Sequence, residues 1–304
     1  MRRRTLAGLG AALLLPRARA EDRPVMRWQV RDMPPHMVYA DGKPPVRIED
    51  LGRGTISAFM RQLLPLLPQY RHEFVEATAA RAEAMVREGQ TLCSMIHLYT
   101  PERLAERYFT PAYPVLGQLQ AQVVVHRSQL ARFAALGRPL SLAALLQRGD
   151  LSGAMSAGRS FGAGVDRVIR AQGAGSSNLR TVVVVRHSSV LTMLRARRMD
   201  YALDFTGGVE DYLRSVNAPG ELVCLPIVEA PPIPLSYASC SRNEEGRRQI
   251  EAIDAAIRRL AQGPEREAWT GSAFLGWRPP LEAPERARLK RFFDERARGG
   301  PQIE

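Results

Sequence analysis

The chain has 304 residues, of which 43 are Lys or Arg and 31 are Asp or Glu, so its formal net charge is +12 at pH 7. The basic residues are almost all Arg and are scattered between acidic residues, which argues against a nucleic-acid-binding surface. Beyond the N-terminus no segment is apolar for about 18 residues, so the remaining chain is predicted to lack a membrane-spanning helix.

The first twenty residues have the pattern of a secretory signal peptide. Three arginines at positions 2–4 precede the uncharged run 5–15, and Ala18-Arg19-Ala20 offers a small-x-small cleavage site. Cleavage would leave 304 − 20 = 284 residues beginning at Glu21, with a net charge of 12 − 5 = +7. The sequence therefore predicts export to the periplasm. An N-terminal membrane anchor or a buried helix are the alternatives, and the choice between the general and the twin-arginine export route stays open.

Short apolar runs alternate with segments of helical periodicity along the mature chain. Strands are predicted at 26–30, 73–77, 91–97, 120–126, 154–157, 181–185, 201–205, 221–227 and 235–239. Helices are predicted at 55–67, 79–87, 141–147, 163–171, 189–197, 243–262 and 285–298, and another begins at Thr100-Pro101, where Thr suits the N-cap. The β-branched run 181–185 predicts a strand buried on both faces, and the charged segment 285–298 predicts a surface helix.

This alternation predicts an α/β chain with mostly parallel sheets. No low-complexity linker divides the sequence. The pattern therefore favours two lobes joined by crossing strands over two separate domains on a tether.

The motifs of the common metal, nucleotide and hydrolase sites are missing from the sequence. His72-Glu73 begins like a zinc-protease helix but lacks the second His, and Gly162-Ala163-Gly164 lacks the third glycine of a dinucleotide-binding loop. No Gly-x-Ser-x-Gly segment and no Cys-x-x-Cys pair occur. The sequence thus predicts no metal ion and no cofactor, and it does not indicate an enzyme.

Three cysteines occur, at positions 93, 224 and 240. Export implies an oxidising compartment, so one disulfide is expected with one thiol left over, and three pairings are open.

Four local motifs follow one another in a characteristic order. The first is an aromatic and Pro-rich loop after the first strand. The second is Thr100-x-Glu102-Arg103, which precedes a Phe-Thr-Pro-Ala-Tyr segment at 109–113. The third and fourth are Gly158-Arg159-Ser160 and Met199-Asp200-Tyr201. These motifs resemble those of the family 3 extracellular solute-binding proteins of polar amino-acid ABC transport. That family has Thr-x-x-Arg, then Phe-Ser-x-Pro-Tyr, then a Gly-x-Ser/Thr turn and an Arg-x-Asp-Ala strand entry, and the likeness extends over nearly the whole mature chain.

The resemblance implies the type II periplasmic-binding-protein fold, in which two α/β lobes are joined by two crossover strands with a ligand cleft between them. It implies a first lobe at 21–118 plus 225–304 and a second lobe at 119–224. It also places Cys93 and Cys240 on neighbouring strands, which favours their pairing as the disulfide. An ABC permease in the inner membrane is the implied partner.

Six residues are predicted to hold the ligand. Arg103 offers a two-pronged donor for a carboxylate, Ser160 a hydroxyl at a helix N-terminus, and Asp204 an acceptor for an ammonium group. Trp28 and Tyr39 would cover an apolar or cationic part of the ligand, and Glu229 would make a contact from the hinge side.

Each of these residues also has a structural alternative. Arg103 would pair with a neighbouring Glu, Ser160 would only cap a helix, Asp204 would end a strand, Trp28 and Tyr39 would lie in the core or cover a loop, and Glu229 would lie on the surface.

One stretch departs from the amino-acid-binding pattern. The small hydroxyl residues that usually precede Thr-x-x-Arg are replaced by Ile96-His97-Leu98-Tyr99, so the carboxylate pocket is altered and a peptide, an aromatic acid or another signal becomes a candidate ligand. The function predicted first is a periplasmic solute-binding protein for a small polar, carboxylate-bearing, amino-acid-like ligand. A periplasmic sensor or partner-binding protein on the same fold is the alternative. A lyase of the cyclohexadienyl dehydratase kind would need a poised acid such as Glu229 or Asp204 in the cleft.

Overall fold

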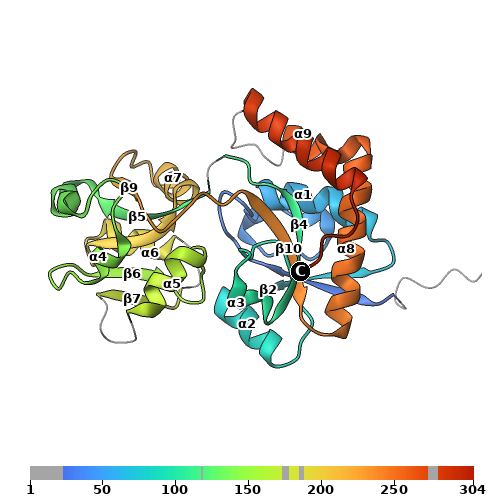
Figure 1. The fold of residues 1–304 in the computed structure, drawn as a ribbon, viewed down its shortest axis with the longest axis horizontal. Coiled ribbons are helices and arrows are strands. Elements are labelled where there is room, and N and C mark those ends of the chain that lie inside the picture. Colours follow the sequence, from blue (N-terminus) through green and yellow to red (C-terminus); the bar gives the residue numbers. More distant parts are fainter. Residues whose placement is uncertain (1–22, 118, 173–177, 185–187, 273–279) are drawn as a thin grey trace, which may run out of the picture.

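The computed structural model describes residues 23–117, 119–172, 178–184, 188–272 and 280–304, which form two α/β lobes. Figure 1 shows the lobes next to each other, each with helices packed around its own sheet. The predicted fold of two α/β lobes is confirmed, but both sheets are mixed rather than mostly parallel, because the strands that enter from the crossovers pair antiparallel to their neighbours. The predicted signal peptide, 1–20, lies outside the described residues.

The sheet of the first lobe has the strand order β2–β1–β3–β10–β4. Strand β1 is parallel to β2 and β3, whereas β10 is antiparallel to β3 and β4. The strands are β1 (Val25–Val30), β2 (Arg71–Glu76), β3 (Cys93–Ser94), β4 (Arg107–Pro114) and β10 (Leu235–Ser241). The helices are α1 (Thr55–Leu63), α2 (Ala79–Arg87), α3 (Pro101–Leu104), α8 (Glu244–Gln262) and α9 (Ala283–Arg298).

The sheet of the second lobe has the order β7–β6–β8–β5–β9. Strand β6 is parallel to β7 and β8, and β5 is antiparallel to β8 and β9. Its strands are β5 (Ala121–His126), β6 (Gly153–Ser156), β7 (Leu179–Val182), β8 (Tyr201–Phe205) and β9 (Leu222–Pro226). Its helices are α4 (Leu142–Leu146), α5 (Ala163–Ala171), α6 (Ser189–Arg195) and α7 (Thr206–Ser215).

The chain crosses between the lobes twice, from β4 to β5 and from β9 back to β10 (Figure 1). The two crossovers are hydrogen-bonded to each other, since the Val115 N–H donates to the Pro234 carbonyl at 2.9 Å and the Ile233 N–H donates to the Leu119 carbonyl at 2.8 Å. Strand β9 stays in the second sheet as far as Pro226. The division of the lobes after 118 and after 224 remains a proposal.

Two predicted strands differ from the structure. Of the segment 91–97, only Cys93–Ser94 pairs in the sheet, because the chain then leaves the sheet and residues 95–98 line the space between the lobes. Strand β7 is an edge strand rather than one buried on both faces; Val183, just after it, is 84 % exposed. Of the predicted strand 181–185, only residues 181 and 182 belong to β7, and residue 185 lies outside the described residues, so the β-branched run indicated a strand but overstated its burial.

The segment 107–114 forms β4, the edge strand of the first sheet, which the sequence patterns did not identify as a strand. Pro111 lies in it, and proline is tolerated where a strand has a free edge. Helix α9 also differs from the predicted surface helix, because it buries Leu289, Phe293 and Arg296 against the rest of the first lobe.

Cys93 and Cys240 lie opposite each other on β3 and β10 and form a disulfide with an S–S distance of 2.00 Å. This is the pairing that the resemblance implied. Cys224, on β9, is the remaining thiol, and burial raises its pKa to about 12. None of the described helices combines the length and the apolar composition that a membrane span requires.

Candidate functional site

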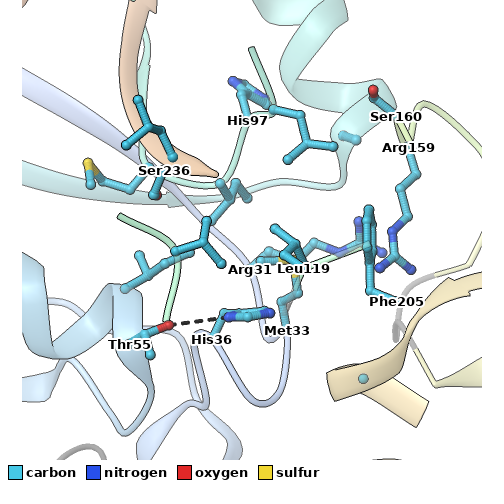
Figure 2. Close-up of a pocket in the computed structure, with 18 of the residues that line it drawn as sticks. Arg31, Met33, His36, Thr55, His97, Leu119, Arg159, Ser160, Phe205 and Ser236 are labelled. Atoms are coloured by element: carbon cyan, nitrogen blue, oxygen red, sulfur yellow. Dashed lines mark hydrogen bonds between the residues drawn. The ribbon is translucent and has the colours of Figure 1, made fainter. Parts of the chain in front are cut away.

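A cleft with a cavity volume of about 120 Å³ lies between the two lobes. Both lobes line it, and its wall is largely apolar, with arginine and histidine side chains set into it (Figure 2). The first lobe supplies Gln29, Arg31, Met33, Pro34, His36, Thr55, Ile56, Ala79, Met95, Ile96, His97, Leu98, Arg103, Tyr113, Leu235 and Ser236; the second lobe supplies Arg159, Ser160, Phe205 and Gly208; the first crossover supplies Val115, Leu116 and Leu119.

The lobes touch each other beside this cleft. Gly158, whose φ is +68°, lies so close to α2 that an added Cβ would be 2.7 Å from the Ala80 backbone nitrogen. A Cβ on Gly207 would be 3.5 Å from Pro35 of the first lobe. Glycine at position 158 therefore permits both the left-handed backbone and the close approach of the second lobe.

Arg31 reaches the cleft from the loop that directly follows β1. The residue is only 7 % exposed, and its Nε–H has no hydrogen-bond partner among the described residues. Burial, followed by the positive charge of Arg159, lowers the pKa of Arg31. Arg31 is thus a buried donor group aimed at the space between the lobes.

Arg159 enters from the second lobe, on the turn between β6 and α5. Its Nη2 lies 3.0 Å from the Asp204 carboxylate, and its Cζ lies 4.9 Å from the centroid of the Phe205 ring and 5.3 Å from that of Phe161. Figure 2 shows Arg159 extending along Phe205 at one end of the cleft. The ion pair and the aromatic contacts fix the guanidinium in place, as expected for a buried arginine.

Arg103 lies on α3, and its helix begins as predicted, because Thr100 accepts a hydrogen bond from the Arg103 N–H at 3.4 Å and Pro101 occupies the first helical position. The side chain lines the cleft, and its Nη1 donates to the Leu98 carbonyl at 3.2 Å. Its Nε lies 3.8 Å from Glu83 on α2. Burial lowers the pKa of Arg103, and nearby carboxylates, Glu83 first, oppose that effect.

Glu83 also lies 3.8 Å from Arg107 and from His97. Neither carboxylate oxygen makes a hydrogen bond among the described residues. Burial, together with the charges of Arg107 and Arg103, lowers the pKa of His97 well below its usual value, so this imidazole is neutral at pH 7. Glu83 thus stands beside two buried guanidinium groups, and Glu106 also acts on both of them.

Ser160 lines the cleft just before α5, which begins after Gly162 at φ +99°. Its hydroxyl donates to Asp166 at 2.5 Å and accepts from the Gly162 N–H at 3.2 Å, and Asp166 also accepts from the Phe161 N–H at 2.8 Å. The serine therefore lies at the predicted helix N-terminus, with its hydroxyl proton directed to Asp166.

The remaining predicted residues lie outside the lining of the cleft. Asp204 is 1 % exposed and is the ion-pair partner of Arg159. Glu229 caps α4, accepting hydrogen bonds from the Leu142 N–H at 3.0 Å and the Ala143 N–H at 3.1 Å. Neither acid is placed in the cleft, where a lyase would require it.

The two predicted aromatic residues belong to the core of the first lobe. Trp28 is fully buried and donates from Nε1 to His72 Nδ1 at 3.1 Å. Tyr39 is 7 % exposed, and burial together with Glu76 raises the pKa of its hydroxyl. The Phe and Tyr rings that do line the cleft are those of Phe205, at the end of β8, and Tyr113, on β4.

Two further arginines, Arg31 and Arg159, were not among the predicted ligand residues. Both follow the carboxyl end of a strand in a parallel part of a sheet, which is the edge where ligands bind in α/β folds. Their position just after a predicted strand could therefore have indicated both arginines as ligand residues from the sequence. Among the described residues, no group of three or more His, Cys, Asp or Glu side chains is placed to hold a metal ion.

No protein-family model matches the sequence, and neither does any curated protein. Solved structures do match. A substrate-binding protein of an amino acid ABC transporter is 15 % identical, with a TM-score of 0.55 over 82 % of this chain and 99 % of the other. A substrate-binding protein of an ABC uptake transporter from Streptococcus pneumoniae, with bound histidine, is 12 % identical, with a TM-score of 0.60 over 87 % of this chain and 96 % of the other.

An ancestral arginine-binding protein bound to arginine gives 13 % identity and a TM-score of 0.59, over 82 % of this chain and 97 % of the other. The chain has the fold of the two-lobed substrate-binding proteins. The resemblance seen in the sequence motifs is therefore confirmed at the level of the fold, and the low identity marks a divergent sequence on it.

Proposed function

We propose that the protein is a periplasmic solute-binding protein that captures a small carboxylate-bearing ligand between its lobes. One observation carries the proposal: guanidinium groups from both lobes, Arg31 and Arg103 from the first and Arg159 from the second, line one cleft. A guanidinium presents a planar fork of donors that matches a carboxylate, so a ligand held from both sides favours the closed arrangement of the lobes.

Delivery to an ABC importer is part of the proposal. It is supported by the fold, which this chain shares with substrate-binding proteins of ABC transporters. The predicted signal peptide supports a periplasmic location, and a mature N-terminus at Glu21 in protein recovered from the periplasm would test it.

Thermal unfolding of the mature protein against a library of amino acids, short peptides and small organic acids tests the binding function. A ligand present at about 100 times its Kd stabilises the folded state by about 2.7 kcal/mol and raises the Tm. We expect one class of carboxylate compounds to raise the Tm, and we expect this rise to be smaller in Arg103→Ala. Arg81→Ala, on α2 and exposed, is the matched control and should keep the rise. A library without any stabilising carboxylate would contradict the proposed function.

A further inference from the structure

Two arginines from different lobes meet at one end of the cleft. Arg31 comes from the loop after β1, and Arg159 comes from the turn after β6, where it lies along Phe205 (Figure 2). The charge of Arg159 is, after burial, the largest cause that lowers the pKa of Arg31, and the smaller effects of Tyr39 and Asp204 oppose it. Like charges removed from water repel each other more strongly than in bulk solvent. An anion between the two guanidinium groups would replace this repulsion with two attractive contacts.

The two arginines are not equally provided with partners. Arg159 has the Asp204 carboxylate at 3.0 Å. Arg31 is 7 % exposed, and its Nε–H is buried without a hydrogen-bond partner among the described residues. A buried donor without an acceptor costs free energy, and a buried charged group costs more. Arg31 is therefore a group for which a bound carboxylate would supply the acceptor.

Three acids that lie close to residues of the lining, but are not part of it, already hold protein groups. Asp204 pairs with Arg159, and Asp166 accepts from the Ser160 hydroxyl and the Phe161 N–H. Glu83 lies among Arg103, Arg107 and His97, 3.8 Å from each. Among the described residues that line the cleft there is no Asp or Glu. An ammonium group in this cleft would meet guanidinium groups and no carboxylate.

A neutral acceptor is present in the same wall. Gln29 lies two residues before Arg31 on the same face of the chain and is 1 % exposed. Its amide nitrogen donates to the Ala77 carbonyl at 3.2 Å, while its Oε1 is buried without a hydrogen-bond partner among the described residues. A neutral donor such as a hydroxyl suits this oxygen.

We propose that the ligand is an organic acid without an ammonium group, whose carboxylate is clamped between Arg31 of the first lobe and Arg159 of the second and whose apolar body packs on the cleft wall. A hydroxyl on the ligand would find Gln29 as its acceptor. This inference rests on the proposed function and narrows its ligand class. It also assigns the main contact with the ligand carboxylate to Arg31 and Arg159, rather than to Arg103, which the sequence motif had indicated.

Isothermal titration with matched ligand series tests the ligand class. Each series holds one carbon skeleton and changes only the substituent at C2: phenyllactate, 3-phenylpropanoate and phenylalanine; 2-hydroxyglutarate, glutarate and glutamate; 2-hydroxy-4-methylpentanoate, 4-methylpentanoate and leucine. In the series that binds, we expect the 2-amino member to bind at least about tenfold more weakly than the hydroxy or unsubstituted member, because the guanidinium groups repel its ammonium group and the lining offers no carboxylate to offset that repulsion. Tighter binding of the 2-amino member would overturn the inference and leave the proposed function standing. Binding by no series and by no library compound would overturn both.

Variants test the anchor. Arg31→Gln, which removes the charge but keeps a polar side chain, should weaken the tightest ligand about 30-fold or more. Arg159→Lys keeps a positive charge beside Asp204 but loses the two-pronged geometry, and it should weaken the same ligand while the fold is retained. Arg180→Ala, at an exposed position on β7 outside the lining, is the matched control and should bind as wild type. Unchanged affinity in both Arg31→Gln and Arg159→Lys, with Tm values confirming that the variants are folded, would overturn the assignment.

Discussion

Among the described residues, a buried Arg–Asp pair lies in each lobe, and these two pairs have different surroundings. In the first lobe, Arg296 on α9 lies 2.7 Å from Asp254 on α8, and both side chains are 1 % exposed. In the second lobe, Arg159 lies 3.0 Å from Asp204, with side-chain exposures of 12 % and 1 %. The Arg296–Asp254 pair lies in the core of its lobe, whereas Arg159 lines the cleft.

The partners of the first pair account for its position. Asp254 also accepts hydrogen bonds from the Thr110 hydroxyl at 2.7 Å, the Arg258 Nε–H at 3.1 Å and the Gln302 N–H at 3.2 Å. This network joins α8, α9, β4 and the C-terminal segment of the chain. Arg159, by contrast, packs against the Phe205 ring and also lines the cleft, as Arg31 does. A buried ion pair that is hydrogen-bonded to several elements of its lobe stabilises the fold, whereas an ion pair beside a cavity can also contact a ligand.

Arg296→Ala tests this distinction with the largest expected effect. It leaves the Asp254 carboxylate buried without its charge partner, so the free energy of unfolding should fall by about 3–5 kcal/mol. Arg159→Ala should cost less, because Arg159 lines the cavity and its removal would open the Asp204 carboxylate to water. Chemical denaturation of the two variants beside wild type measures both losses.

Arg248→Ala, whose ion pairs with Glu244 and Glu245 are exposed, is the control and should leave stability unchanged. At temperatures where Arg296→Ala is folded, its ligand affinity should equal that of wild type. A loss in Arg159→Ala as large as that in Arg296→Ala would remove the contrast between the two pairs.

Removal of the disulfide is a second test of whether a structural element outside the cleft affects stability without affecting ligand affinity. It joins β3 and β10 across a sequence separation of 147 residues, so its removal frees a long loop in the unfolded chain. The double substitution Cys93→Ser and Cys240→Ser should lower the free energy of unfolding by about 2–4 kcal/mol. Ligand affinity measured well below the Tm should change little, and a large affinity loss there would show that the disulfide also shapes the site. Cys224→Ser is the matched single-thiol control.

The comparison of the two lobes also explains what could be predicted from the sequence. Helix α2 has the predicted bounds, because its signals are local: Thr78 caps it, accepting from the Arg81 N–H at 3.2 Å, and Gly89 takes a φ of +86° just after its end. The N-terminus of α3 at Thr100-Pro101 is local in the same way. Strand β4 was not identified, since Pro111 and its aromatic residues gave no alternating pattern and its pairing partner, β10, is more than a hundred residues away.

The site depended even more on distant contacts. The sequence motif correctly brought Arg103 and Ser160 to the cleft wall. Trp28 and Tyr39 could not be separated from ligand-covering aromatics, since their place in the core is decided by helices packed on that face of the sheet. Asp204 and Glu229 are satisfied by Arg159 and by the N-terminus of α4, partners that no spacing in the sequence reveals.

The smallest effect that we predict concerns His97, on the first-lobe side of the cleft. It is 5 % exposed, its Nδ1 lies 3.2 Å from the Ser239 hydroxyl, and Glu83, Arg103 and Arg107 are the charged groups nearest to its ring. Burial and the two arginines hold the pKa of His97 well below the 6.5 of an unfolded chain. At pH values below 6.5, the imidazole of His97 therefore stays neutral in the folded protein, whereas in the unfolded chain it takes up a proton.

The direction of the pH effect follows from this difference. Above pH 6.5 both states carry a neutral His97, and the stability that this residue contributes is fully present; below pH 6.5 only the unfolded state binds the proton, so the contribution is lost as the pH falls. Relative to a His97→Gln variant, wild type should lose up to about 2 kcal/mol of unfolding free energy between pH 6.5 and pH 5. Urea unfolding of both proteins across pH 5–8 measures the difference, in which the carboxylates common to both proteins cancel. Parallel curves would mean that His97 has the same pKa in the folded and unfolded states, and that burial and the two arginines do not disfavour its charged form in the folded protein.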